Sequence, residues 1–67
     1  MNLNFKNGKA QIKEGKNVIA TIYDRAVFFA GTKVNWNAKF PFALSMNGGQ
    51  AEVRSLDEAI KLFYSEL

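Results

Sequence analysis

The sequence predicts an α+β fold: an antiparallel β-meander of about four to six short strands with one C-terminal α-helix packed on one face of the sheet. Three observations predict it. Apolar and polar residues alternate through much of the first 53 residues, glycine-containing turns interrupt that alternation, and the last residues change to helical spacing. We expect a single domain over residues 1–67, with the sheet over about 2–54 and the helix over about 56–66. Because the chain starts with Met, we also expect it to be a whole gene product.

The N-terminal residues have the pattern of a β-hairpin. Asn7-Gly8 is the strongest two-residue hairpin signal, because both residue types tolerate a positive φ. A two-residue turn pairs Phe5 with Ala10. It also pairs Leu3 with Ile12, so the apolar residues share one face. The other face receives Asn2, Asn4, Lys6, Lys9, Gln11 and Lys13.

A second turn at residues 14–17 leads into a strand from Val18 to Tyr23, which is rich in β-branched residues. The length of the turn leaves the register of this strand open. Either Val18, Ala20 and Ile22 face the core, or Ile19, Thr21 and Tyr23 do.

Residues 25–30 fit two structures. We favour a strand, in which the adjacent Phe28 and Phe29 point to opposite faces and one of them leaves the core. The alternative is one helical turn with Asp24 as its N-cap and Gly31 at its end, which can bury both rings. An exposed Phe beside Tyr23 would be an anchor for a partner.

From Val34 to Met46, apolar residues occupy every even position. This period of two predicts a long strand with one apolar face, bent or divided near Pro41, which has no N–H to donate. Its aromatic residues Trp36, Phe40 and Phe42 could stack on nucleic-acid bases. We expect them in the core instead, because a domain of this size needs them there.

The next turn is expected at Gly48-Gly49. It pairs Met46 with Ala51. It also pairs Leu44 with Val53, which keeps the apolar face intact. We do not expect a phosphate-binding loop here, because the glycines precede a strand and not the start of a helix.

Residues 55–58 form a capping box that begins the C-terminal helix. Ser55 is expected to accept a hydrogen bond from the Glu58 amide, and the Glu58 side chain to reach back to the Ser55 amide. The apolar stripe of the helix consists of Leu56, Ala59, Ile60, Phe63 and Leu67, flanked by Tyr64. We expect Leu62 to point away from that stripe.

The composition argues against catalysis. The 67 residues include no His and no Cys, which excludes disulfides, zinc fingers and iron–sulfur sites and removes the commonest general base. No pair among the six acidic residues suggests two placed catalytic carboxylates. We therefore expect no enzyme activity, no cofactor and no metal.

With no apolar leader and no apolar run long enough to span a bilayer, we expect a cytoplasmic protein that binds no membrane.

The net charge of +3 is uneven, because residues 1–50 are basic and residues 51–67 are mildly acidic. The polar sheet face is the main candidate for a binding surface, since Lys can meet phosphate and Asn and Gln can bond base edges or peptide groups. Its candidate residues are Lys6, Lys9, Lys13, Asn35, Asn37 and Lys39. Asn4 and Gln11 belong to the same face. Tyr23, Arg25, Phe28 and Phe29 are the further contact candidates.

These observations lead to two functional hypotheses. The first is a small non-catalytic binding protein that occupies the surface of a larger protein complex. Phage and mobile-element inhibitors of host defence complexes, including anti-CRISPR proteins, are often short chains of this kind. The alternative is a nucleic-acid-binding module that uses the Lys- and Asn-rich sheet face. A homodimer formed through an exposed edge strand is compatible with either hypothesis.

Overall fold

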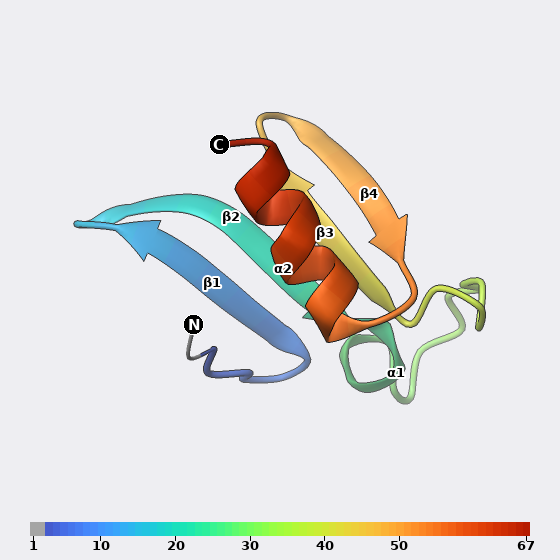
Figure 1. Ribbon diagram of the computed structural model, residues 1–67. Helices are drawn as coiled ribbons and strands as arrows, with labels where there is room; N and C mark the ends of the chain where they lie inside the picture. The colour runs from blue at the N-terminus through green and yellow to red at the C-terminus, as the bar shows by residue number, and fades with distance from the viewer. Residues whose placement is uncertain (1–2) are drawn as a thin grey trace.

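Within the described residues, four antiparallel strands form one open sheet in which neighbours in space are also neighbours in sequence. The computed structural model describes residues 3–67. The elements are β1 (Lys9–Glu14), β2 (Asn17–Asp24), α1 (Arg25–Phe28), β3 (Phe42–Met46), β4 (Gly49–Val53) and α2 (Leu56–Ser65). The predicted α+β meander with a C-terminal helix is confirmed (Figure 1). The predicted start of the sheet at about residue 2 lies outside the described residues, and the first regular strand begins at Lys9.

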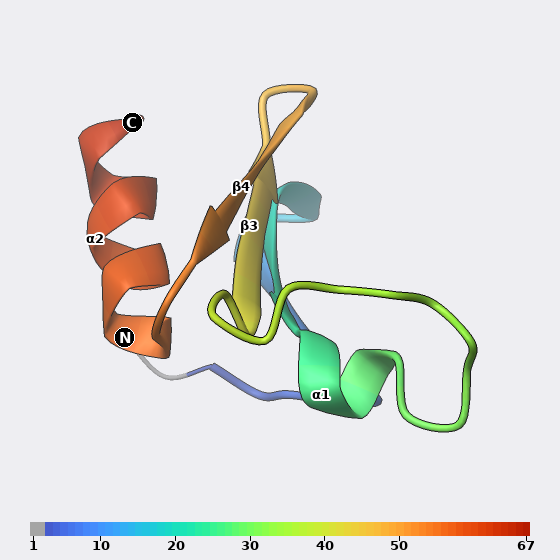
Figure 2. The ribbon, with the colours of Figure 1, turned by 90° about the vertical axis from the view of Figure 1, so that its right-hand side faces the viewer.

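The two faces of the sheet are covered unequally. The inner face carries α2, which packs on β3 and β4 (Figure 2). The outer face carries α1 and the loop over residues 29–41 at one end. Ala43 lies on the outer face, because it alternates with the inner residue Leu44, and yet it is fully buried. The outer face is therefore a packed surface at that end and a solvated one elsewhere.

The core lies between α2 and the inner face. Ile22 is its largest fully buried side chain. The buried cluster consists of Ile12, Ala20, Ile22, Leu44, Val53, Ala59 and Phe63. Phe42 and Met46 pack against this cluster from β3. A chain of this size without disulfides depends on this apolar contact for most of its stability.

A β-bulge fixes the register of β2 that the sequence left open. Ile12 pairs with Ala20, but the next residue, Lys13, pairs with Val18, so Ile19 is the extra residue. Ala20 and Ile22 consequently face the core. Val18 is turned to the face of Lys13 and stays 47% exposed.

The hairpin between β3 and β4 turns at Asn47-Gly48, and the predicted turn at Gly48-Gly49 is wrong. Asn47 and Gly48 both have positive φ, and Met46 pairs with Gly49. Leu44 pairs with Ala51 in place of Val53. The register differs from the predicted one by two residues, so the same side chains still face the core.

The predicted N-terminal hairpin forms only at its turn. Lys6 and Lys9 pair across Asn7-Gly8, but residues 3–5 leave the sheet. Leu3 packs against the core cluster, and the Phe5 ring meets the Phe42 ring edge-on at 6.5 Å between centroids. The predicted pairing of Leu3 with Ile12 is therefore wrong, because apolar contacts draw the segment away from β1.

Residues 25–28 form a helical turn, so the favoured strand is wrong here. The Phe29 amide donates to the Arg25 carbonyl, and the Arg25 amide donates to the Pro41 carbonyl. Asp24 occupies the N-cap position, as the alternative predicted, but makes no side-chain cap bond. The Pro41 contact is long-range and has no signature in the local sequence.

The predicted strand over Val34–Met46 begins only at Phe42. The Phe40 amide donates to the Asn37 carbonyl, which closes a turn, and Pro41 cannot continue a ladder. Trp36 and Phe40 are half-buried in the loop and are not among the residues that pack on the core cluster. The expected core position is thus wrong for Trp36 and Phe40 and right for Phe42.

Helix α2 begins at Leu56 and ends at Ser65, one residue before the predicted end. Ser55 accepts a hydrogen bond from the Glu58 amide at 3.1 Å, as predicted. The Glu58 side chain instead accepts from the Arg54 amide, at 3.0 Å. Leu62 packs against the core cluster, and Leu67 is 73% exposed, so both of these predictions are wrong. Neither helix within residues 3–67 has the length and apolar character that crossing a bilayer requires.

Candidate binding surface

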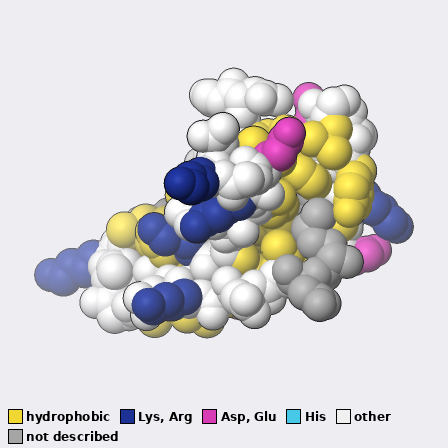
Figure 3. Space-filling view, turned by 90° about the vertical axis from the view of Figure 1, so that its left-hand side faces the viewer, with side chains coloured by type: hydrophobic (Ala, Val, Ile, Leu, Met, Phe, Trp, Pro, Cys, Tyr) yellow, Lys and Arg dark blue, Asp and Glu magenta, His cyan; other side chains and the backbone are white. Residues whose placement is uncertain are grey.

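A shallow hollow of about 500 Å³ lies where the N-terminal segment separates from β1. It is lined by Asn4, Lys6, Asn7, Lys9, Gln11 and Lys13, and we refer to it as the basic notch. Figure 1 shows the two chain segments diverging from the Asn7-Gly8 turn. Figure 3 faces this side of the molecule and shows Lys and Arg side chains gathered on it. Three of the lining residues are cationic, and none of the described ones is acidic.

The hairpin turn brings two of the lysines directly opposite one another. The Lys6 amide donates to the Lys9 carbonyl at 2.9 Å, and the Lys9 amide donates to the Lys6 carbonyl at 3.2 Å. Like charges in opposed positions destabilise a β-ladder. Lys13 follows on the same face of β1 two pleats further along. The notch therefore concentrates positive charge. Neither of the two ion pairs found in residues 3–67 includes a lysine of the notch, so that charge is not neutralised by them.

The notch also opens onto an unpaired strand edge, because β1 is the first strand of the sheet. Lys9 directs its backbone groups away from β2, toward Lys6. In an antiparallel ladder this direction alternates from residue to residue. The amide and carbonyl groups of Gln11 and Lys13 therefore face the open edge.

An aromatic cluster borders the notch on the outer face. Tyr23 pairs with Lys9 across the β1–β2 ladder. Its ring lies 5.0 Å from that of Phe28, which in turn lies 5.1 Å from Phe29. Phe28 is 38% exposed and Phe29 is half-buried. Of the two Phe residues proposed as anchors, Phe28 is the more accessible, and it lies next to the basic residues.

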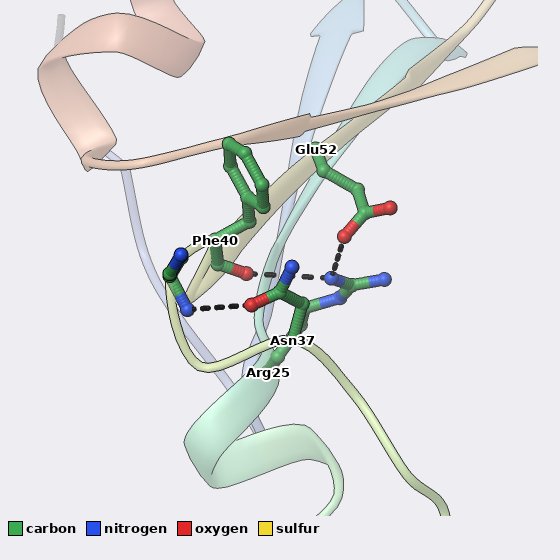
Figure 4. A network of polar contacts seen from close by, with 5 residues as sticks. Arg25, Asn37, Phe40 and Glu52 are labelled. Carbon is green, nitrogen blue, oxygen red and sulfur yellow. Dashed lines mark hydrogen bonds and ion pairs between the residues drawn. The ribbon is translucent and has the colours of Figure 1, made fainter.

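Arg25 lies in a structural network (Figure 4). Its guanidinium donates to the Glu52 carboxylate at 2.6 Å and to the Phe40 carbonyl at 3.3 Å. The Arg25 side chain is only 14% exposed. Arg25 therefore ties α1 and the loop to β4, and it is not one of the residues that line the notch.

The predicted polar face divides into two parts. Asn35, Asn37 and Lys39 belong to the loop and not to a strand beside β1. The Asn37 side chain accepts from the Lys39 amide at 3.0 Å, which makes it a turn-forming residue. Of the described residues predicted for this face, the structure brings together Lys6, Lys9, Lys13, Asn4 and Gln11. Asn7, which the sequence predicts only as a turn residue, also lines the notch, because the turn forms one end of it.

A second hollow, of about 310 Å³, lies between the β3–β4 turn and the end of α2. Its lining mixes apolar residues such as Met46 and Leu62 with Gln50 and Glu66. In the part of the chain that the structure describes, no group of three or more His, Cys, Asp or Glu residues is placed to hold a metal ion. Comparison of the chain with protein-family models, curated proteins and solved structures yields no match.

Proposed function

We propose that this protein is a non-catalytic binding module that contacts an acidic surface of a larger protein partner through the basic notch. One observation carries the proposal: the notch gathers Lys6, Lys9 and Lys13 in one hollow whose described lining residues include no carboxylate. Ammonium groups held together in this way attract acidic groups and raise the rate of encounter with them.

The neighbouring aromatic residues support a protein partner. Tyr23 and Phe28 are in contact, and Phe28 retains 38% exposure next to the Asn7-Gly8 turn. Val27, on the same helical turn, is 54% exposed. Aromatic anchors beside charged residues are typical of protein interfaces, in which few residues supply most of the affinity.

The proposal includes inhibition of a larger complex as the biological role. In this role the chain would cover a surface of its partner and perform no chemistry, as phage and mobile-element inhibitors such as anti-CRISPR proteins often do. Its support is the charge of the notch and the absence of His and Cys from the sequence.

A second candidate function, nucleic-acid binding, is favoured by one specific observation. Three amide side chains, those of Asn4, Asn7 and Gln11, line the notch together with the lysines. Amides can bond base edges, and lysines can meet phosphates. The described lining includes no Arg, the residue best suited to bidentate contacts with phosphate or guanine, which weakens this candidate.

Two charge-matched double variants test the proposal. Lys9→Glu with Lys13→Glu reverses charge in the notch, and Lys33→Glu with Lys39→Glu makes the same change in the loop. Fluorescence anisotropy with labelled polyglutamate, single-stranded DNA and duplex DNA, each at low and at physiological salt, compares them with the parent protein.

We expect the parent to bind polyglutamate more tightly than DNA at each salt concentration, and both affinities to fall as salt rises, because lysine contacts to carboxylates and to phosphates are both screened. The notch variant should bind polyglutamate at least about tenfold more weakly, and the loop variant within about twofold of the parent. Equal losses in the two variants would refute the notch as the contact surface. DNA binding that persists at physiological salt and depends on Lys9 and Lys13 would favour the second candidate.

A further inference from the structure

We propose that the open edge of β1 accepts an extended acidic segment of the partner as an added strand, with its carboxylates beside Lys9 and Lys13. The inference rests on the proposed function and specifies the kind of partner. It begins from the backbone of β1, where Gln11 and Lys13 present amide and carbonyl groups to the basic notch. Strand addition uses such groups for affinity and uses the alternating side chains for specificity.

The N-terminal segment leaves this edge open. Of its described residues, only Lys6 pairs with β1, at Lys9. Beyond that pair, Leu3 is held by the core cluster and Phe5 by the Phe42 ring. These contacts hold the segment away from Gln11 and Lys13, so the notch is the space in which an incoming strand would lie.

The lysines select against a second copy of this chain. Antiparallel pairing of two β1 edges centred on Gln11 places Lys9 of one copy opposite Lys13 of the other, and like charges in that position are unfavourable. Lysine on an edge strand is a common protection against self-pairing. The same side chains favour a strand with Glu or Asp at alternate positions.

Backbone geometry favours a peptide over a nucleic acid at this edge. The exposed groups alternate between donor and acceptor at strand spacing, which another extended peptide satisfies and a phosphate backbone does not. On the inner side the neighbouring residues, Ala10 and Ile12, are buried and apolar. The matching segment therefore alternates acidic residues with apolar ones.

The probe is a capped peptide of alternating Glu and Val, matched in length to β1. A copy with the β1-facing amides N-methylated lacks the donors that strand addition requires, and a Lys-Val peptide reverses the charge. Amide hydrogen exchange of the protein is followed by NMR with each peptide. Two proline variants accompany it: Gln11→Pro removes an outward-facing donor of β1, and Gln50→Pro removes the equivalent donor on the β4 edge, away from the notch.

We expect the Glu-Val peptide to slow exchange of the Gln11 and Lys13 amides. N-methylation or Gln11→Pro should weaken binding about tenfold, and Gln50→Pro should have little effect. The Lys9→Glu, Lys13→Glu protein should prefer the Lys-Val peptide. If Gln11→Pro does not fold, the N-methylated peptide still decides the result.

Binding without amide protection, or binding indifferent to N-methylation, would overturn strand addition and leave the acidic-surface proposal standing. Strand addition would also be overturned if the Glu-Val peptide fails to bind while polyglutamate binds in a Lys9- and Lys13-dependent manner. The acidic-surface proposal would again stand. If neither probe responds to those lysines, both proposals fail.

Discussion

Gly8 lies directly against the backbone of Phe28. A Cβ atom built on Gly8 would be 2.3 Å from the Phe28 nitrogen, and the φ of Gly8 is +80°. The Gly8 carbonyl also accepts from the Asp24 amide at 2.7 Å, just before α1 begins. The turn that forms one end of the basic notch is therefore also the support of α1, and this contact holds the lysines and the Tyr23–Phe28 pair in one surface.

Gly8→Ala is expected to destabilise the protein by roughly 2–4 kcal/mol, because it adds a steric overlap to the cost of a positive φ. Gly15→Ala is the matched control, since Gly15 has φ +62° and no atom within 4 Å of its added Cβ. That variant should lose only about 1 kcal/mol. Urea unfolding followed by circular dichroism measures both, and equal losses would show that the Phe28 contact is unimportant.

Arg25 and Glu52 form the better protected of two ion pairs in residues 3–67. Glu52→Gln should cost about 1 kcal/mol, a modest value because the Glu52 side chain is 48% exposed. Lys61→Gln breaks the pair with Asp57, in which both side chains are more than three-quarters exposed, and should cost less than about 0.5 kcal/mol. Thermal unfolding of the two variants at low and high salt measures the contribution of each ion pair separately. A larger loss from Lys61→Gln would contradict the assignment of Arg25 to a structural network.

Leu62 and Leu67 provide a test of which face of α2 is buried. Leu62→Ala should cost roughly 1–2 kcal/mol, because this side chain packs on the core cluster and is half-buried. Leu67→Ala should change the free energy of unfolding by less than about 0.5 kcal/mol, since Leu67 is 73% exposed. The opposite ranking in chemical denaturation would restore the helical stripe predicted from the sequence.

Asn37 is expected to act through the loop and not through the partner. Asn37→Ala removes the acceptor of the Lys39 amide and should cost about 0.5–1 kcal/mol, while Asn37→Asp keeps the acceptor and most of the stability. Affinity for polyglutamate should be unchanged in Asn37→Ala. A loss of that affinity, without a loss of stability, would return Asn37 to the contact surface.

The parts of the fold that depend on local signals were predictable. The start of α2 follows from the Ser55 cap, and the first hairpin turn from Asn7-Gly8. The same Asn-Gly signal is present at residues 47–48 and predicts the observed register between β3 and β4. The structure of residues 25–41 was not predictable in this way. Arg25 is held by Pro41 and Glu52, which are far away in the sequence, and the alternation from Val34 resembles a strand although Asn37 closes a turn.

The candidate site was likewise predictable only where local signals determine it. Lys6, Lys9 and Lys13 could be placed together because one hairpin turn and strand alternation relate them. Asn35, Asn37 and Lys39 could not, because their predicted place depended on a strand that does not form. The open edge of β1 was also hidden, since a complete N-terminal hairpin would have covered it.

The most direct measurement is residue-by-residue mapping of amide chemical shifts as polyglutamate is added to the parent protein at physiological salt. The account predicts that the largest changes cluster at the residues of the basic notch and at Phe28. Changes centred on residues 33–39 or on α2, with the notch unaffected, would contradict it.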